Sequence, residues 1–461
     1  MTRFTPEQAD ALEFVMANDG ILLIKAGAGT GKTFMSKQIV KELRPKSGLY
    51  TAFNKAIVQE GIERFAGTNV ESKTFHALAH SFVKPTMPIE SFSYKCITEK
   101  LTYAEKRLVI DQVDMFFVSA SDCMDSFFDK QFKNHSKART LTDICCKYVQ
   151  GMADGSVNPT FNFMLKCLHL MMLEGTAVIK KDIVILDEIN DVTAVVLEIF
   201  KLIESPKKLG LGESHQAIYQ FLNLIDGFEE LKNQATTMYF TQSYRCSIDI
   251  AKRINDKMSE VMDPDFKFIG TDEPIRNGLT LYCTMTNAQI VDIIYDRIAI
   301  GKGFKLLRKP AEIFAASLAV LSASQGKKPY QKKYEFLVDT FQSYKEQDKH
   351  KSYFKFLNAE VDDKEINNAI KLLLKLSSKN VSLYDLYKKA KETKVDKSFT
   401  ISTVFTSKGL EFETVYIADD LNNNFKQACE GELETDEAIT AMRCYYVACS
   451  RAGVNLVNSI I

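Results

Sequence analysis

Short apolar runs alternate with stretches of helical periodicity over the first 80 residues of the chain. The run 21–24, Ile-Leu-Leu-Ile, is followed by the glycine-containing segment 26–33 and then by residues 34–40, whose pattern is typical of a helix. Farther along, the run 183–186 has the same strand character and is followed directly by two acidic residues. Strands and helices that alternate in this way predict βαβ units on a parallel sheet.

Two segments of a different character interrupt this alternation. Residues 81–175 contain few strand signals, and stretches such as 105–113 have helical periodicity. Residues 331–396 are also helical in pattern and are rich in lysine, tyrosine and phenylalanine. Further strand signals lie on both sides of this second segment, at 279–283, 304–307, 399–404 and 415–418.

We therefore expect an α/β fold with two domains, each interrupted by a mostly helical insertion. A chain of 461 residues is too long for one hydrophobic core, which agrees with this division. The expected boundaries are 1–80 and 176–245 for the first domain, 81–175 for its insertion, 246–330 and 397–461 for the second domain, and 331–396 for its short insertion.

Composition and charge restrict the classes of partner. Lys+Arg and Asp+Glu both number 59, so any surface that binds nucleic acid must be a local patch. The ten cysteines are scattered without a C-x-x-C pair, so we expect no zinc or iron–sulfur site. The start of the chain has no signal-peptide core and no apolar run approaches membrane length, which predicts a reduced, cytoplasmic protein without a membrane partner.

The segment 26–33 carries the strongest chemical signal. A strand, a glycine-rich loop, Gly-Lys-Thr and a helix follow one another in the layout of a phosphate-binding P-loop. Glycine backbone N–H groups and the helix N-terminus close around phosphate oxygens. The alternative, a glycine turn without a ligand, does not explain why all four features agree. The residues predicted to bind ATP here are Ala26, Gly27, Ala28, Gly29, Thr30, Gly31, Lys32 and Thr33.

Each polar residue of the loop has an expected role. Lys32 should reach the β- and γ-phosphates, and the Thr33 hydroxyl should hold Mg²⁺. Asp187 and Glu188, which follow the second apolar run, supply the complementary chemistry. We expect Asp187 to hold Mg²⁺ through its waters and Glu188 to orient and deprotonate the attacking water. An isolated Asp-Glu pair could equally be an acidic helix cap, but the P-loop upstream favours the catalytic interpretation.

With these two signals, the chain resembles a UvrD/Rep-type superfamily 1 DNA helicase. The motifs stand in the family's order along nearly the whole length, which makes the set far more specific than any single motif. The P-loop is joined by segments 5–8, 51–56, 74–78, 187–191, 212–221, 242–245, 403–412 and 446–452. The resemblance implies two RecA-like P-loop domains and ATP with Mg²⁺ as cofactors.

The resemblance also assigns roles around the nucleotide. It implies that Gln8 reads adenine, that Gln216 senses the γ-phosphate, and that Tyr244 stacks on adenine. Arg245 and Arg451 would meet the γ-phosphate, and hydrolysis would then be coupled to domain closure. The catalytic set is therefore Lys32, Asp187, Glu188, Gln216, Arg245 and Arg451, with Glu411 as a further nucleotide contact.

A second set of residues is implied to contact DNA. Three of its aromatic members are candidate platforms for base stacking, and packing in the core is the alternative for each. The set is Phe53, Asn54, Lys55, Thr74, His76, Tyr219, Phe221, Ser407 and Lys408. His76 and His80 are also spaced to share a metal ion, but no third ligand is near, so we expect none.

Several positions depart from the family pattern. Phe34 replaces a frequent Arg after the P-loop, Asn190 replaces Gln, and Phe405 replaces His. None of these changes removes a catalytic group, so we expect an active enzyme.

A lysine-rich stretch that includes Lys327, Lys328, Lys332 and Lys333 lies among aromatic residues. It fits a phosphate-tracking surface and a solvated helical face equally well.

The expected function is that of an ATP-dependent DNA helicase, a DNA-stimulated ATP hydrolase. By resemblance it moves 3′→5′ on single-stranded DNA and unwinds duplexes in replication, repair or recombination. Expected partners are single-stranded DNA and single-strand/duplex junctions, with single-strand-binding or replication proteins as candidates. Two alternatives remain: a translocase that strips proteins from single-stranded DNA, and a nucleotide-gated scaffold in a replication or recombination complex.

Overall fold

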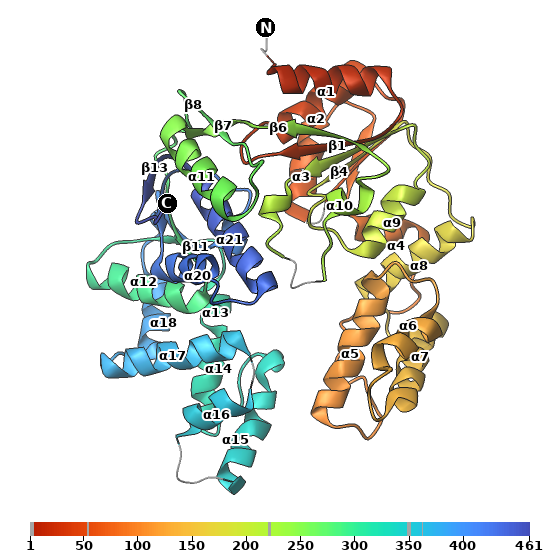
Figure 1. The fold of residues 1–461 in the computed structure, drawn as a ribbon. Helices are drawn as coiled ribbons and strands as arrows, with labels where there is room; N and C mark the ends of the chain where they lie inside the picture. Colours follow the sequence, from red (N-terminus) through yellow and green to blue (C-terminus); the bar gives the residue numbers. More distant parts are fainter. Residues whose placement is uncertain (1–3, 53–54, 220–222, 348–351, 362) are drawn as a thin grey trace. The chain divides into compact units, whose positions relative to one another are not determined.

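The computed structural model describes residues 4–52, 55–219, 223–347, 352–361 and 363–461 (Figure 1). The chain divides into two compact units, Met1–Thr241 and Gln242–Ile461, called unit 1 and unit 2 below. Each unit is built around its own parallel sheet. The α/β class with parallel sheets and many helices is therefore confirmed.

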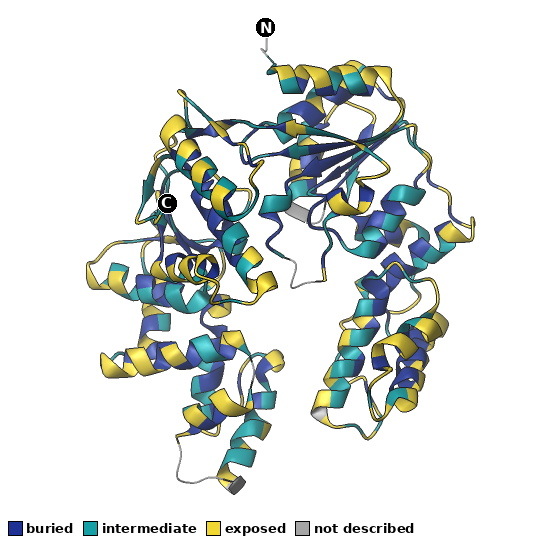
Figure 2. Cartoon of the chain, in the orientation of Figure 1, coloured by how far each residue is buried: buried dark blue, intermediate teal, exposed yellow. Residues whose placement is uncertain are grey.

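Unit 1 contains a six-stranded parallel sheet with the order β3-β2-β4-β5-β1-β6. The strands are β1 Gly20–Ala26, β2 Gly48–Thr51, β3 Val70–Lys73, β4 Ile183–Asp187, β5 Lys207–Gly212 and β6 Thr236–Phe240. Both predicted apolar runs form strands, β1 and β4. All five residues of β4 are buried, as expected for a parallel strand covered on both faces (Figure 2).

Helices cover both faces of this sheet. Leu22 and Ile24 pack with α1, α2 and α3 on one face, whereas Leu23 packs with α4, α8 (Phe161–Leu173), α9 and α10 on the other. The alternation of side chains along a strand therefore divides the core into two layers. The helix bounds are α1 Pro6–Ala17, α2 Lys32–Leu43, α3 Lys55–Arg64, α4 Phe75–Phe82, α9 Ala194–Leu202 and α10 Gly227–Leu231.

A helical segment separates β3 from β4 in sequence. Its helices are α5 Tyr103–Val118, α6 Met124–Phe132, α7 Ala138–Asp154 and α8 Phe161–Leu173, and the predicted helix at 105–113 lies within α5. No strand occurs between β3 and β4, a stretch whose residues are all described. Phe116, Phe117, Phe128 and Phe132 form the centre of a separate hydrophobic core. These four helices lie within residues 81–175, the segment predicted to be a helical insertion.

Unit 2 contains a five-stranded parallel sheet with the order β10-β11-β9-β12-β13, and a second, two-stranded sheet of β7 and β8. The strands are β7 Gln242–Ser247, β8 Ile269–Thr271, β9 Thr280–Thr284, β10 Lys305–Leu306, β11 Phe399–Thr403, β12 Phe412–Ile417 and β13 Ala452–Val457. The four strand signals noted around the second helical segment correspond to β9, β10, β11 and β12.

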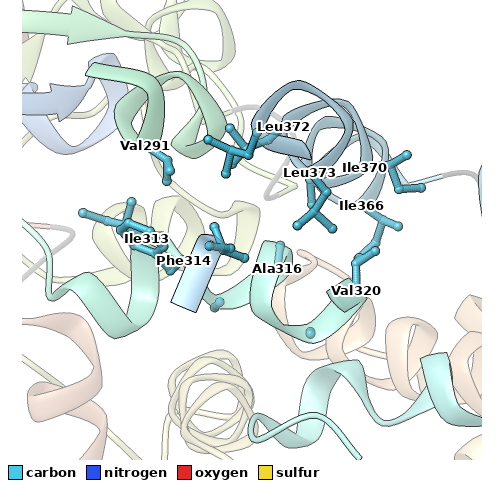
Figure 3. Packing of buried hydrophobic residues seen from close by; sticks show 14 of the residues in the cluster. Val291, Ile313, Phe314, Ala316, Val320, Ile366, Ile370, Leu372 and Leu373 are labelled. Atoms are coloured by element: carbon cyan, nitrogen blue, oxygen red, sulfur yellow. The ribbon is translucent and has the colours of Figure 1, made fainter. Parts of the chain in front are cut away.

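The helices α12 to α18 of unit 2 share one large hydrophobic core, which also includes Ile401 of β11. Figure 3 shows part of it: Val291 of α12, Phe314 immediately before α14, Val320 within α14, and Ile366 and Leu373 of α17 point toward one another. The bounds are α11 Ile248–Val261, α12 Asn287–Ala299, α13 Pro310–Ile313, α14 Ala315–Ser324, α15 Phe336–Gln347, α16 Tyr353–Glu360, α17 Lys364–Ser378, α18 Leu383–Glu392, α19 Val404–Ser407, α20 Asp419–Cys429 and α21 Thr435–Cys449.

This core extends beyond the segment predicted as the second insertion. The helices α13 and α14 precede residue 331, yet they pack in the same core as α15–α18. The helical region thus begins at Pro310, directly after β10. The sequence from Ala315 to Ser324 is apolar, and its hydrophobicity has little helical periodicity, which explains why no insertion boundary was visible there.

Candidate active site

The P-loop lies where the sequence predicts it, between β1 and α2. Gly29 and Gly31 adopt left-handed backbone conformations with φ of 72° and 88°, which glycine accepts without strain. The loop is held from both sides: Gly27 N donates to Phe240 O at 3.0 Å, and the Thr30 hydroxyl donates to Gly27 O at 2.8 Å. Lys32 is the first residue of α2, so the loop leads directly into a helix N-terminus.

Gln8 of α1 lies against this loop. Its amide Nε2 donates to Thr30 O at 3.1 Å, and its side chain also completes a capping box with Thr5 at the start of α1. A Cβ atom at Gly31 would lie 3.0 Å from the same amide. The structure therefore places Gln8, predicted to read adenine, in direct contact with the P-loop.

The structure brings the P-loop lysine to the acidic pair. Lys32 Nζ lies 3.3 Å from Glu188 Oε1, and both side chains are largely buried. Asp187 is the last residue of β4 and is buried, whereas Glu188 is partly exposed. Glu188 has a φ of 55°, a conformation that is uncommon for a residue with a side chain. Such backbone conformations cluster at functional sites.

Asp187 is surrounded by hydrogen-bond donors. Its Oδ2 accepts from the Tyr50 hydroxyl at 2.5 Å, and its Oδ1 accepts from Glu188 N at 3.0 Å. Arg64 NH1 lies 3.9 Å from Oδ2. Burial raises the pKa of Asp187 above its usual value, and the neighbouring Glu188 carboxylate raises this pKa further. Burial likewise raises the pKa of Tyr50, so its hydroxyl keeps the proton that it donates.

The oxygen atoms at the end of β4 and at the start of α2 are suitable ligands for a magnesium ion. A buried carboxylate beside a second carboxylate is unfavourable without a cation, and a divalent cation would oppose the rise in the pKa of Asp187. Oxygen ligands of this kind are those that Mg²⁺ prefers. Thr33 lies in the first turn of α2 and has an exposed side chain. Its hydroxyl oxygen is a further potential ligand for the cation.

Gln216 belongs to a buried network that follows the acidic pair. Its Nε2 donates to Glu213 Oε2, and Glu213 N donates to Asn190 Oδ1 at 2.9 Å. Asn190, which departs from the family's glutamine, therefore ties the end of β4 to the segment after β5. The network holds Gln216 on the short 3₁₀ turn Ser214–Gln216.

In unit 2, Arg245 lies in β7 and is buried. Its Nε and NH2 atoms donate to Glu411 Oε1 at 3.0 and 2.7 Å, and its NH1 donates to Ser450 O at 3.0 Å. Glu411 is 41% exposed in its side chain and thus neutralises the arginine from the solvent side. The adjacent Tyr244 is exposed, which leaves its ring accessible for stacking.

Arg451 is more deeply buried, with 1% of its surface exposed. Its guanidinium donates to Val447 O at 3.0 Å, to Leu410 O at 3.4 Å and to the Ser450 hydroxyl at 3.1 Å. These bonds fix the end of α21 to the residue before Glu411. In this structure Arg451 has a structural role within unit 2, beside the role predicted for it in catalysis.

The residues predicted to contact DNA are only partly described. Phe53, Asn54 and Phe221 lie outside the described residues, as does the side chain of Lys55. Thr74 caps α4, where its hydroxyl accepts from Ala77 N at 3.1 Å. His76 Nε2 lies 3.1 Å from Asn162 Oδ1 of α8, so this histidine joins α4 to the helical segment.

Three further predicted DNA contacts differ in exposure. Ser407 is fully buried, and its hydroxyl donates to Val404 O at 3.2 Å, which supports a structural role for this side chain. Tyr219 and Lys408 are partly exposed. The structure thus makes the lysine the more accessible member of the Ser407–Lys408 pair.

The lysine-rich stretch of unit 2 is partly neutralised. Lys328 Nζ lies 3.2 Å from Glu335, and Lys333 Nζ lies 3.3 Å from Glu365. Tyr330 is fully exposed, whereas Tyr334 is buried in the core. Of these two tyrosines, Tyr330 is presented to the solvent and Tyr334 belongs to the core.

Other kinds of site are not found in the described part of the chain. There, no group of three His, Cys, Asp or Glu side chains is arranged to hold a metal ion. None of the helices searched is long and apolar enough to cross a membrane. All ten cysteines carry free thiols.

Sequence reasoning missed two residues of this site, Tyr50 and Arg64. Tyr50 stands in an apolar strand and has the pattern of a core residue. Arg64 is the last residue of α3 and is separated from Asp187 by more than a hundred residues. No motif pointed to either one. The pairing of β2 with β4 brings Tyr50 to the acidic pair, and the packing of α3 on the Tyr50 ring brings Arg64 there.

Comparison with known proteins adds the family. A model of the UvrD-like helicase C-terminal domain matches residues 97–461. F-box DNA helicase 1 of Gallus gallus is 24% identical over 464 aligned residues, which cover 91% of this chain and 45% of that protein. F-box DNA helicase protein 1 of Schizosaccharomyces pombe is 26% identical over 290 residues, which cover 55% of this chain and 33% of that protein. The chain spans less than half the length of either relative. Because the family model matches well over half of the chain, the protein belongs to the UvrD-like helicase family.

Proposed function

We propose that this protein is an ATP-driven DNA helicase that moves along single-stranded DNA and separates duplex strands. The observation that carries the proposal is the contact between Lys32 of the P-loop and Glu188 at the end of β4. A P-loop lysine beside an acidic pair is the arrangement that phosphoryl transfer from ATP requires. Family membership, and the name DNA helicase borne by both relatives, support DNA as the substrate.

In the proposed reaction, the residues of unit 1 bind and hydrolyse ATP. Lys32 moves from Glu188 to the β- and γ-phosphates, where its charge stabilises the transition state. The released Glu188 carboxylate accepts a proton from the attacking water. Mg²⁺, held by Thr33 and Asp187, would neutralise charge on the phosphates. Gln216, on its buried network, senses whether the γ-phosphate is present.

Unit 2 contributes the arginines and the adenine contact. We infer that Arg245 and Arg451 act on the γ-phosphate and that Tyr244 stacks on adenine. The Arg245 guanidinium already donates to the Glu411 carboxylate. The γ-phosphate would either replace this carboxylate or bind the guanidinium beside it. A planar guanidinium is suited to this task because it makes two parallel hydrogen bonds to phosphate oxygens.

The proposed DNA contacts are those implied by the family motifs, with one change. Phe53, Asn54, Lys55, Thr74, His76, Tyr219, Phe221 and Lys408 are retained, whereas Ser407 is buried and is assigned a structural role. Phosphate contacts should dominate the affinity, so binding should be nearly independent of sequence and should weaken steeply with salt. Movement is proposed to be 3′→5′ by analogy with the UvrD/Rep group.

The test measures ATP hydrolysis by the chain with and without single-stranded DNA, and then the opening of 3′-tailed and 5′-tailed duplexes. We expect DNA to stimulate hydrolysis and only the 3′-tailed duplex to open. Hydrolysis with protein removal but no strand separation would favour a translocase. ATP binding with no DNA-stimulated turnover would favour a nucleotide-gated scaffold. Replication, repair and recombination all remain compatible with the proposed activity.

A further inference from the structure

A buried tyrosine hydroxyl holds the acidic residue at the end of β4. Tyr50 of β2 is fully buried, and its hydroxyl donates to Asp187 Oδ2 at 2.5 Å. Tyr50 pairs in register with Ile185 of the neighbouring strand, two residues before Asp187 and on the same face of the sheet. The other carboxylate oxygen accepts from Glu188 N at 3.0 Å. Each oxygen of Asp187 thus has its own donor.

Arg64 supports the tyrosine from the end of α3. Its NH1 atom donates to the Tyr50 hydroxyl at 3.2 Å and lies 3.9 Å from Asp187 Oδ2. The Arg64 side chain is 8% exposed, and its guanidinium lies 5.3 Å from the centre of the Tyr50 ring. The arginine is therefore fixed over the ring and turned toward the carboxylate.

The backbone of α3 is fitted to the tyrosine ring. A Cβ atom at Gly61 would lie 2.6 Å from Tyr50 Cε1 and 2.7 Å from Cδ1, which is closer than real contacts allow. The Phe65 ring packs against Tyr50 on the adjacent turn, with ring centroids 5.2 Å apart. The position of the hydroxyl is thus determined by packing against helix and strand, independently of its hydrogen bonds.

We propose that Tyr50 and Arg64 are positioning residues, which hold the Asp187 carboxylate in the orientation that receives the cation of a bound nucleotide–cation complex. The inference rests on the proposed function because it takes Asp187 as the residue that holds the cation. Tyr50 cannot touch a nucleotide in this arrangement, because it is fully buried. Residues that orient a metal ligand in this way commonly contribute about 10–100-fold to metal affinity.

The decisive variant is Tyr50→Phe, which removes one hydroxyl and retains the ring that packs on Gly61 and Phe65. Two measurements are made on the whole chain: binding of a fluorescent ADP analogue in EDTA, and binding of Mn²⁺ to the ADP complex by electron paramagnetic resonance. We expect Mn²⁺ affinity to fall about 10-fold or more while ADP affinity in EDTA stays within twofold. Arg64→Met should have the same pattern, and Arg64→Lys should restore part of the affinity.

Tyr148→Phe is the matched control in the same unit. The Tyr148 hydroxyl is also buried and bonded to a carboxylate, Glu99, at 2.6 Å, but it lies in the helical segment away from Asp187. We expect this variant to bind Mn²⁺ as the wild type does.

Wild-type Mn²⁺ affinity in Tyr50→Phe would overturn the inference and leave the proposed function intact. Equal losses of ADP binding in EDTA and of Mn²⁺ binding would assign Tyr50 a purely structural role. Absence of cation-dependent ADP binding in the wild type would instead contradict the proposed function.

Discussion

Lys32 Nζ lies 3.3 Å from Glu188 Oε1, although 156 residues separate the two in sequence. The pair joins the first turn of α2 to the end of β4, so that the charge meant for phosphate is neutralised by the proposed catalytic base. Arrival of a γ-phosphate would give Lys32 a stronger anionic partner and would release the Glu188 carboxylate. The contact therefore provides a reason for the base to act only when nucleotide is bound.

Removing either member of this pair should abolish turnover in different ways. Lys32→Ala should reduce ATP hydrolysis to background because phosphate charge is no longer neutralised. Glu188→Gln should bind ATP normally but lower kcat by about 10²–10⁴-fold, the usual contribution of a general base. Steady-state ATPase assays with nucleotide titrations separate these effects. Lys37→Ala, on the exposed face of α2, is the control and should keep full activity. Near-wild-type turnover in either first variant would remove the pair from the mechanism.

The two arginines of unit 2 should affect kcat far more than nucleotide affinity. Arg245→Ala and Arg451→Ala should each lower kcat by roughly 10³-fold or more if they stabilise the transferring phosphoryl group. Arg451→Lys should not restore the rate, because an ammonium group lacks the planar fork.

Thermal unfolding must accompany these assays, since Arg451 also binds backbone carbonyls at Val447 and Leu410. Arg297→Lys is the matched control. This arginine donates to Gly303 O at 2.6 Å within unit 2, and its replacement should lower stability without changing kcat. If Arg451→Ala keeps kcat within about twofold, the predicted role in hydrolysis is wrong and only its structural role remains.

The lysine-rich stretch gives a third prediction. Changing Lys327, Lys328, Lys332 and Lys333 together to glutamate should weaken unwinding but spare the ATPase that single-stranded DNA stimulates, if the stretch holds duplex ahead of the motor. The slope of DNA affinity against salt should also decrease, because fewer phosphates are neutralised. Lys388 and Lys389 on the exposed face of α18 provide a charge-reversed control. Undiminished unwinding would make the stretch an ordinary solvated surface, in keeping with the carboxylate partners of Lys328 and Lys333.

A buried histidine should make the stability of unit 1 depend on pH. His169 of α8 is 1% exposed, and burial, aided by the neighbouring Lys166, lowers its pKa from 6.5 to about 4. Between pH 6.5 and about 4, His169 is therefore protonated in the unfolded chain but neutral in the folded chain. The stabilisation is fully present above pH 6.5 and is lost as the pH falls toward 4, with a magnitude on the order of 3 kcal/mol.

Chemical denaturation across this pH range measures the effect. His169→Leu should flatten the dependence of unfolding free energy between pH 6.5 and 4, whereas His80→Gln at an exposed position of α4 should leave it unchanged. An identical pH dependence in wild type and His169→Leu would show that other groups are responsible.

Local patterns predict much of the fold. The apolar runs that become β1 and β4 are short, uniformly hydrophobic and followed by polar residues, so their strand character and their functional ends are both visible in the sequence. The P-loop is similarly local, because its glycines, lysine and helix follow one another. By contrast, the sequence does not show that the helical region of unit 2 already begins with α13 and α14. The apolar, alanine-rich stretch of α14 gives little sign of such a boundary.

The environment of the site depends on contacts between distant segments. Tyr50 reaches Asp187 only because β2 lies beside β4, and Arg64 reaches both only because Gly61 lets α3 approach the sheet. Strand order and helix approach are tertiary properties that a motif does not contain. The same limit applies to Arg451, whose motif predicts a catalytic role but not the backbone carbonyls that its guanidinium binds.

Strand separation by the chain is the most direct measurement of the proposed function. Duplexes with a 3′ tail, a 5′ tail or blunt ends are incubated with wild type or Lys32→Ala, with ATP and Mg²⁺, and the released strand is quantified. We predict that wild type opens the 3′-tailed duplex alone and that Lys32→Ala opens none. Opening of only the 5′-tailed duplex would contradict the polarity. Equal strand release by wild type and Lys32→Ala, or none by wild type while it hydrolyses ATP on single-stranded DNA, would contradict an ATP-driven helicase.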